Sequence, residues 1–304
     1  MVVPKKELML IMNKKITGYQ VFSFFNILIM LLITFVTFYP IYYVVVASFS
    51  DPGALSRTYG PLWYPLKPFT LDAYKMVFRN AGILTGYLNT LFILVVGVTI
   101  NLTMTVLGAF FLTIKGPMLQ NGIVKMIIFT MYFSGGMVPI YLNIRDLGLL
   151  NSLWSLILPT AISTSNLIIM KAAFQGIPDS LVESALLDGA SYYKILWKIM
   201  VPLSKATMAV MVLYYGVGHW NSWFDASIYL QDSKKFPLQL VLRNILVLSQ
   251  MQSMAAEVDA VEMTQFVELV KYALIVVASL PILIVYPFLQ KYFTKGVMIG
   301  AIKG

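Results

Sequence analysis

The sequence contains no cysteine and a single histidine, His219. Without cysteine there can be no disulfide, thiolate metal site or lipidated thiol. One histidine cannot form a two-histidine zinc motif or a multi-histidine iron site. The chain also lacks a phosphate-binding loop ending in GK[ST] and a GxGxxG motif before a helix, so it does not bind ATP by those means.

Charged residues are also scarce, at 12% of the chain, and they bracket long apolar runs instead of interrupting them. A helix needs roughly 20 mostly apolar residues to cross a hydrocarbon core of about 30 Å. Six charge-free runs are suited to this length, which argues against a soluble buried core. They lie between Lys15 and Asp51, Arg79 and Lys115, Lys125 and Arg145, Asp146 and Lys171, Lys205 and Asp225, and Lys271 and Lys291. We therefore expect an all-α integral membrane protein with six transmembrane helices.

The predicted helix centres contain no charged side chain. Proton relays and ion-coupling carboxylates inside a membrane need ionisable residues. The sequence therefore argues against an intramembrane enzyme and against a proton-coupled transporter. A sodium site built from backbone carbonyls needs no such residue and stays open as an alternative.

The crossings divide the chain into four parts. The apolar run 16–50 is too long for a signal-peptide core of about 7–15 residues, so we expect it to be retained as the first helix. The parts are a cytoplasmic tail (1–20), the first transmembrane helix with an outer segment (21–82), a core of five transmembrane helices (83–291) and a cytoplasmic C-terminal tail (292–304). The helices are expected at about 21–49, 83–114, 122–143, 151–174, 204–230 and 269–291.

Lysines and arginines indicate the orientation. With the N-terminal tail inside, the inner segments hold 13 of the 22 basic residues, a bias of the sign that the positive-inside rule requires. We therefore expect a multi-pass protein of the bacterial plasma membrane with both termini in the cytoplasm. The net charge of +9 places lysines against an anionic leaflet and requires no nucleic-acid partner.

One polar insert, the segment 177–203, interrupts the apolar pattern and carries the signals of two short helices. Ser180 and Glu183 have the spacing of a capping box at the start of the first helix. An apolar stripe follows at four-residue spacing, formed by Leu181 with Ala185 and by Val182 with Leu186.

The end of the first helix and the course of the second are also indicated. Gly189 stands where a helix terminus favours a residue that tolerates positive φ. Ser191 can then cap the second helix, and Pro202 stops or kinks it. We expect this helical pair to form a docking surface on the cytoplasmic side.

The stretch ESALLDGASYYKILWKIMVPL resembles the EAA loop of ABC importer permeases, in which E-A-A-x-x-x-G is followed by I-x-L-P. The matching residues are Glu183, Ala185, Gly189, Ile199 and Pro202. The departures are Ser184 and Val201, both small changes.

Further segments resemble the carbohydrate-uptake branch of these permeases, both MalG-type and LplC/YtcP-like. Residues 133–159 are similar to its third and fourth helices, and HWNSWFD and the closing GVMIGAIKG are similar to MalG-type subunits. The resemblance covers essentially the whole chain and implies the MetI/MalG-like transmembrane domain of an ABC importer.

The resemblance implies a chain that is not itself an enzyme and holds no cofactor. Its implied partners are a second homologous permease subunit, two copies of a cytoplasmic ATPase that bind Mg-ATP, an extracellular solute-binding protein and membrane lipid. Implied ATPase-coupling residues are Ser180, Leu181, Glu183, Ala185, Asp188, Gly189 and Pro202. The C-terminal residues Gly300, Lys303 and Gly304 are implied to contact the ATPases.

Aromatic and amide side chains mark candidate sugar contacts, because rings can stack on sugars while amides bind their hydroxyls. The candidates are Tyr132, Asn166, Trp220, Asn221 and Trp223. Aromatic residues near helix ends also anchor proteins at the membrane interface, which is the alternative. The outer loop 231–268 is similar to the family's loop that reaches toward the binding protein; a solvated loop with an interfacial helix is its alternative.

We therefore expect the transmembrane permease subunit of an ABC importer that takes up a carbohydrate, in particular an oligosaccharide. Closure of the partner ATPases would drive alternating access through the segment 177–203. The alternatives are an ABC permease for another solute, a sodium-coupled secondary transporter and a membrane subunit that only scaffolds.

Overall fold

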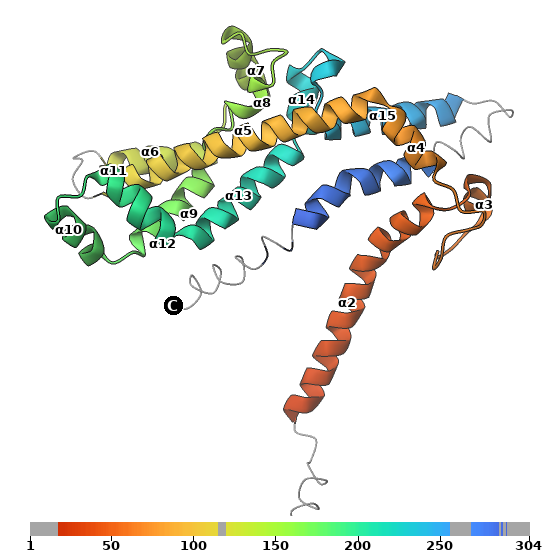
Figure 1. Cartoon of the computed structure of the whole chain (residues 1–304), viewed down its shortest axis with the longest axis horizontal. Helices are drawn as coiled ribbons and strands as arrows, with labels where there is room; N and C mark the ends of the chain where they lie inside the picture. Colours follow the sequence, from red (N-terminus) through yellow and green to blue (C-terminus); the bar gives the residue numbers. More distant parts are fainter. Residues whose placement is uncertain (1–17, 115–119, 256–268, 286, 288–289, 291–304) are drawn as a thin grey trace, which may run out of the picture.

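The computed structural model describes residues 18–114, 120–255, 269–285, 287 and 290. All regular secondary structure in these residues is helical, which confirms the expected all-α class. The helices from residue 81 onward form an elongated body, and the first helix, α2 (Gly18–Ser48), points away from it (Figure 1).

The body is organised around α5 (Ala81–Phe111), a 31-residue helix that runs along its length (Figure 1). The most extensive contacts with α5 come from α13 (Lys205–Trp220), α9 (Thr164–Gln175) and α15 (Leu238–Ala255). The buried apolar residues fall into three clusters, and α5 contributes to each of them through Ile83, Ile93 and Val106. This helix is therefore the common wall of the whole core.

Three glycines spaced 11 residues apart, Gly86, Gly97 and Gly108, bring α5 close to its neighbours. Eleven residues complete about three helical turns, so these glycines share one face. A Cβ at Gly97 would lie 2.6 Å from His219 Nε2, and one at Gly108 would lie 2.9 Å from Leu167 Cδ1. Such distances are shorter than van der Waals contact, so the observed approach of α13 and α9 depends on glycine at these positions.

Buried polar side chains of α5 and α13 pair with each other. His219 Nε2 lies 2.7 Å from Asn101 Oδ1, and Asn101 Nδ2 donates to the Thr160 carbonyl at 2.5 Å. One turn along, the hydroxyls of Thr105 and Tyr215 lie 2.7 Å apart. A hydrocarbon core offers no water, so polar groups there must be satisfied within the protein.

The structure corrects the predicted third, fourth and fifth helices, each expected as one continuous element. The range 122–143 holds α6 (Gln120–Tyr132) and α7 (Met137–Asp146), which are bent by 113°. The range 151–174 holds α8 (Trp154–Ile157) and most of α9, and 204–230 holds α13 and α14 (Trp223–Tyr229).

Local backbone chemistry explains these breaks. Gly136 adopts φ 86° between α6 and α7, a conformation that favours glycine. Pro159 lies between α8 and α9, where it cannot donate a helical hydrogen bond. Asn221 ends α13, and its side-chain Nδ2 donates back to the Val217 carbonyl at 3.0 Å. The apolar pattern alone did not reveal these interruptions because it continues across them.

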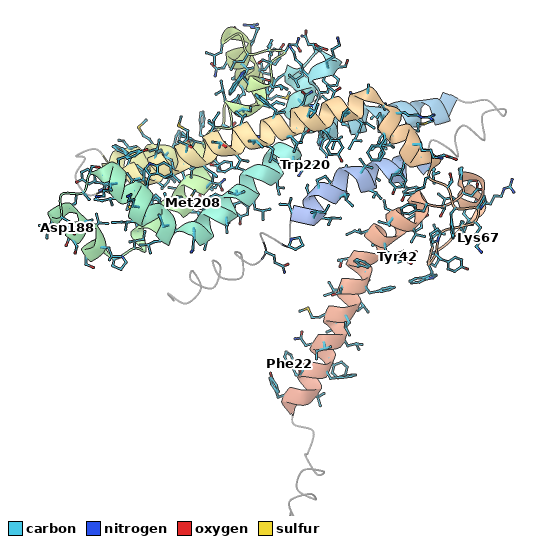
Figure 2. All side chains as sticks on the ribbon, viewed as in Figure 1. Phe22, Tyr42, Lys67, Asp188, Met208 and Trp220 are labelled. Atoms are coloured by element: carbon cyan, nitrogen blue, oxygen red, sulfur yellow. The ribbon has the colours of Figure 1, made fainter. Side chains whose placement is uncertain are left out.

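By length and composition, two described helices, α5 and residues 21–48 within α2, can each cross a membrane. The number rises to four if each of two bent pairs forms one span. Most α2 side chains are exposed, Phe22 among them (Figure 2), whereas its end packs into the body through Val46 and Ala47. An exposed apolar helix of this length is suited to lipid.

Shorter elements lie outside these long helices. The segment after α2 contains α3 (Pro52–Arg57) and α4 (Asp72–Arg79). A short 3-10 helix, Ser233–Lys235, precedes α15, and an apolar helix, Leu269–Val285, packs beside α15 and the start of α5. The described part of the loop 231–268 contains α15, whereas residues 256–268, with Glu257, Asp259 and Glu262, lie outside the described residues.

The packing of α13 on α5 yields a testable prediction. Gly97→Ala places a methyl group against the His219 ring and displaces it from Asn101, so we expect a loss of about 1–3 kcal/mol of stability. The measurement is the midpoint of thermal unfolding of the purified transporter complex. Gly216→Ala on α13 is the matched control, because a Cβ there meets nothing within 4 Å and alanine favours the helix. Equal effects of the two substitutions would contradict this explanation.

Candidate functional site

The segment 177–203 forms a helical hairpin at the end of the body where α5 finishes (Figure 1). Its first helix is α10 (Asp179–Leu187), and Asp188 lies near the tip (Figure 2). Its second part packs against α5 through the rings of Phe110 and Tyr192, whose centroids are 6.4 Å apart. The predicted pair of helices is confirmed.

The predicted capping box is wrong. Pro178 occupies the N-cap position with extended geometry, and the helix already begins at Asp179. Ser180 therefore lies inside the first turn, where its carbonyl accepts a hydrogen bond from Ser184 Oγ at 2.8 Å. The acidic side chain of Asp179 in the first turn suits the positive end of the helix dipole, which favours this earlier start. Glu183 is consequently free for other contacts of the hairpin.

Gly189 ends the first helix as predicted. It has φ 74°, its N–H donates to the Leu186 carbonyl at 3.0 Å, and the N–H of Ala190 donates to the Ala185 carbonyl at 2.9 Å. These two bonds form a Schellman motif, which satisfies carbonyls that the helix end leaves open. A Cβ at Gly189 would meet nothing within 4 Å, so the requirement for glycine is conformational.

The second helical part starts at Ser191 as predicted, but it consists of three consecutive helical segments instead of one. Ser191 Oγ accepts from the Lys194 N–H at 3.4 Å, and α11 (Tyr192–Ile195) continues into a π-helical turn (Leu196–Met200) and α12 (Val201–Leu203). Pro202 lies in this last turn, and the chain then bends by 83° into α13. The predicted kink is therefore present, directly at the junction with the helix that lines the body.

The hairpin uses a different apolar face from the predicted stripe. Val182 and Ala185 pack against the core cluster around α5 and α9, but Leu181 and Leu186 are exposed. Leu187 is 88% exposed. Beside them, exposed Tyr193 and Trp197 form a ring pair with centroids 6.3 Å apart. One side of the hairpin thus holds it to the body, while the other presents apolar and aromatic side chains.

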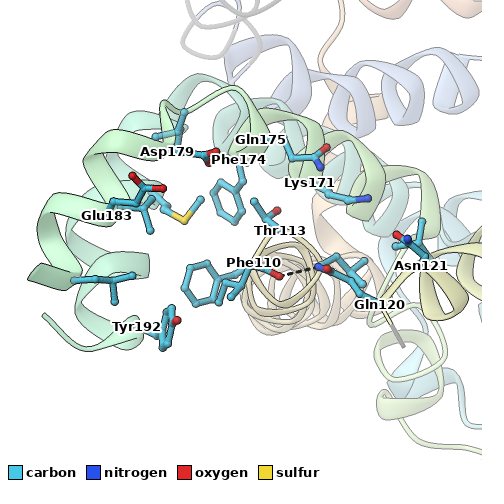
Figure 3. A pocket seen from close by; sticks show the side chains of 17 residues that line it. Phe110, Thr113, Gln120, Asn121, Lys171, Phe174, Gln175, Asp179, Glu183 and Tyr192 are labelled. Carbon is cyan, nitrogen blue, oxygen red and sulfur yellow. Dashed lines mark hydrogen bonds between the residues drawn. The ribbon is translucent and has the colours of Figure 1, made fainter. Parts of the chain in front are cut away.

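A cavity of about 540 Å³ lies between the hairpin and the ends of α5, α6 and α9 (Figure 3). Asp179 and Glu183 line it from α10, and Lys171 and Gln120 line it from the body. Gln120 Nε2 donates to the Ile114 carbonyl at 3.1 Å. The described residues contain no cluster of histidine, aspartate and glutamate suited to a metal ion.

The predicted substrate residues separate into two groups. Trp220, Asn221 and Trp223 line one cavity of about 630 Å³ between α13, α14, α15 and the helix Leu269–Val285. Tyr132, 83% exposed at the end of α6, and Asn166, buried near the start of α9, do not line it. The structure therefore brings three of the five candidates together.

Sequence reasoning missed Arg243, which lies on α15 and lines the same cavity. Its guanidinium carbon stands 4.6 Å from the centroid of the Trp223 ring, a cation–π contact. The available signal was that Arg243 is the one charged residue in an otherwise apolar helical stretch. The predicted tail contacts Gly300, Lys303 and Gly304 lie outside the described residues.

The arrangement is that of a helical membrane protein with an exposed hairpin, and comparison with known proteins identifies its class. The chain is 43% identical to Protein LplC of Bacillus subtilis over 94% of this chain and 96% of the relative. It is 42% identical to the polygalacturonan/rhamnogalacturonan transport system permease protein YtcP of the same species, over 78% of this chain and 82% of the relative. No family model matches.

A solved structure has the same fold: a bacterial ABC transporter involved in the import of the acidic polysaccharide alginate. The TM-score is 0.81 at 32% identity, covering 90% of this chain and 97% of that chain. The chain is therefore a multi-pass transport permease of the inner membrane and not an enzyme. It belongs to the ABC importer permeases of the carbohydrate-transport branch.

The corrected start of α10 generates a second prediction. Ser191→Ala removes a cap and should destabilise the second helical part by about 0.5–2 kcal/mol, whereas Ser180→Ala removes none and should cost less than about 0.5 kcal/mol. Amide hydrogen exchange over residues 179–200 of the purified complex measures both. Faster exchange near residue 182 in Ser180→Ala would show that a capping box forms after all.

Proposed function

We propose that this chain imports an oligosaccharide as one permease subunit of an ABC transporter. The observation that carries the proposal is the agreement among relatives: their names refer to polygalacturonan and rhamnogalacturonan, arabinooligosaccharides and alginate. The cavity beside Trp220 supports it, since a pocket of about 300–1,000 Å³ is typical for a small-molecule ligand. An extracellular solute-binding protein would deliver the substrate.

The exposed side of the hairpin supports a proposal for the ATPase partners. Leu187, Tyr193 and Trp197 are apolar or amphipathic residues at the surface of a segment that also bears charged groups, as a docking face requires. We infer that two copies of a cytoplasmic ATPase dock on this hairpin and on the equivalent one of a second, homologous permease. Mg-ATP would be bound and hydrolysed by the ATPases, and Glu183 and Asp188 would make polar contacts with them.

The route from the hairpin to the cavity supports transport by alternating access. The hairpin joins α13 at Ser204, two residues after Pro202, and α13 ends at Trp220 in the cavity. A rigid displacement of the hairpin by the closing ATPases would tilt α13 and alter the cavity at its other end. The buried pairing of α13 with α5 would make the two helices move together.

We further propose six membrane crossings with both termini in the cytoplasm. Two long helices, the broken elements in the predicted ranges and the apolar helix Leu269–Val285 support this count. The natural absence of cysteine makes single-cysteine labelling direct. Ser233→Cys, exposed before α15, should react with a membrane-impermeant maleimide in intact cells, and Ser184→Cys, exposed on the hairpin, should react only after lysis. Labelling of both in intact cells would contradict the proposed topology.

The coupling role of the hairpin is tested by Gly189→Asp. A residue with a side chain at φ 74° costs about 1–2 kcal/mol, and the substitution adds a negative charge to the proposed docking face. We expect uptake of labelled oligosaccharide to fall to background while the amount of protein in the membrane stays unchanged.

Gly148→Asp is the matched control, because Gly148 has φ 67° and equally open surroundings but lies in the turn after α7. It should retain at least about half of the uptake. Normal transport by Gly189→Asp, or failure of any ATPase to co-purify with the wild-type chain in gentle detergent, would rule out the proposed coupling. The second result would favour a transporter that works without an ATPase.

A further inference from the structure

The segment 58–69 between α3 and α4, here called the aromatic loop, is held against the exposed apolar helix α2. The Leu62 N–H donates to the Tyr39 hydroxyl at 2.9 Å, and the Tyr42 hydroxyl donates to the Trp63 carbonyl. The Trp63 ring lies against α2, with its centroid 5.4 Å from that of Tyr39 and 6.1 Å from that of Phe35. These contacts fix the position of the aromatic loop along α2.

The exposed part of α2 indicates where a hydrocarbon core would end. Nearly all side chains in the range 22–41 are exposed, whereas those of residues 46–48 are buried in the body. Figure 2 shows Phe22 and Tyr42 toward the two ends of this exposed stretch. The stretch contains about 20 residues, or about 30 Å of helix, which matches the thickness of a hydrocarbon core. The Trp63 ring contacts the outer end of this stretch, so it lies where hydrocarbon gives way to headgroups.

The aromatic loop exposes several rings besides Trp63. Tyr59 is 95% exposed and Tyr64 71% exposed, and Phe69 is exposed as well. Exposed apolar patches of this kind mark interaction surfaces. Tryptophan and tyrosine are enriched where a bilayer meets water, because the ring is apolar while its N–H or O–H group reaches a polar partner. Lys67, also exposed in this loop (Figure 2), has the charge that attracts lipid phosphates.

The level of the aromatic loop favours lipid over a protein partner in the aqueous phase. Phe35, which Trp63 contacts, lies about 20 Å along the helix from the end of α2 at Ser48. The chain therefore leaves α2 at Ser48 and folds back along it toward the bilayer. A binding protein that stays in water would not reach a ring at this depth.

We propose that the aromatic loop is an interfacial anchor, whose rings lie at the headgroup level of the outer leaflet and whose Lys67 contacts lipid phosphates. The anchor sets the depth and tilt of α2, as aromatic and basic residues at the interface do for membrane helices. The inference concerns the contact of this chain with lipid and holds for any transported substrate.

The test measures the depth of a nitroxide spin label at Tyr64→Cys. The chain has no natural cysteine, so the label is specific once any cysteine of the partner subunits is replaced by serine. In the full transporter, reconstituted in vesicles of phosphatidylethanolamine and phosphatidylglycerol, collisions of the label with oxygen and with a water-soluble nickel chelate report its depth. We expect the label within about 5–10 Å of the boundary between headgroups and hydrocarbon. A label at Ser233→Cys, exposed before α15, is the control and should behave as a group in water.

Two results would overturn the anchor. If the label at residue 64 meets the nickel chelate as often as the Ser233→Cys label does, the aromatic loop lies in water. If neither oxygen nor the chelate reaches the label, a second permease or another protein covers the aromatic loop instead of lipid.

The phosphate contact is tested by adding Lys67→Gln to the labelled Tyr64→Cys variant. Loss of the charge should shift the label toward water in phosphatidylglycerol vesicles, because the attraction to anionic headgroups is removed. Lys75→Gln is the matched control, since the Lys75 ammonium on α4 is already paired with Asp72 at 2.9 Å, and it should leave the depth unchanged. An unchanged depth in Lys67→Gln, or the same shift in both variants, would overturn the contact of Lys67 with phosphate.

Discussion

The pairing of Asn101 with His219 is the contact on which the arrangement of the body depends. Lipid offers no partner for a buried amide or imidazole, so each group fixes the other, and an unpaired one would cost about 1–3 kcal/mol. The imidazole fits only because Gly97 leaves room for it. Asn101 also binds the Thr160 carbonyl between α8 and α9, so α5, α13 and this break are held as one unit.

This unit connects the two regions to which function is assigned. The hairpin packs on the end of α5 through Val182, Ala185 and Tyr192, and it continues through Pro202 into α13. The other end of α13 supplies Trp220 to the cavity. A closely packed interior transmits displacement because it has little free volume to absorb it. The proposed alternating access therefore needs no further moving part between the hairpin and the cavity than α13 and the helices paired with it.

The sequence predicted what depends on neighbouring residues and missed what depends on distant ones. Gly189, Ser191 and Pro202 were located correctly because helix ends and kinks follow from local backbone chemistry. The capping box at Ser180 was wrong because the helix starts earlier, with Pro178 as its N-cap and Asp179 as its first residue, and spacing alone does not decide between the two starts. The long helices were predicted from apolar length, which continues across the breaks. The contact of Arg243 with Trp223 joins two elements separated by a turn and a loop, and no local pattern encodes it.

Arg243 stands out because charged residues make up only 12% of the chain. Arg243 is exposed at the wall of the cavity of about 630 Å³, and its guanidinium lies over the Trp223 ring. The sequence of α15 is LQLVLRNILVLSQMQSMA, in which Arg243 is the one charged residue. The same scarcity that excludes proton-relay chemistry from the predicted helix centres therefore makes this single arginine informative.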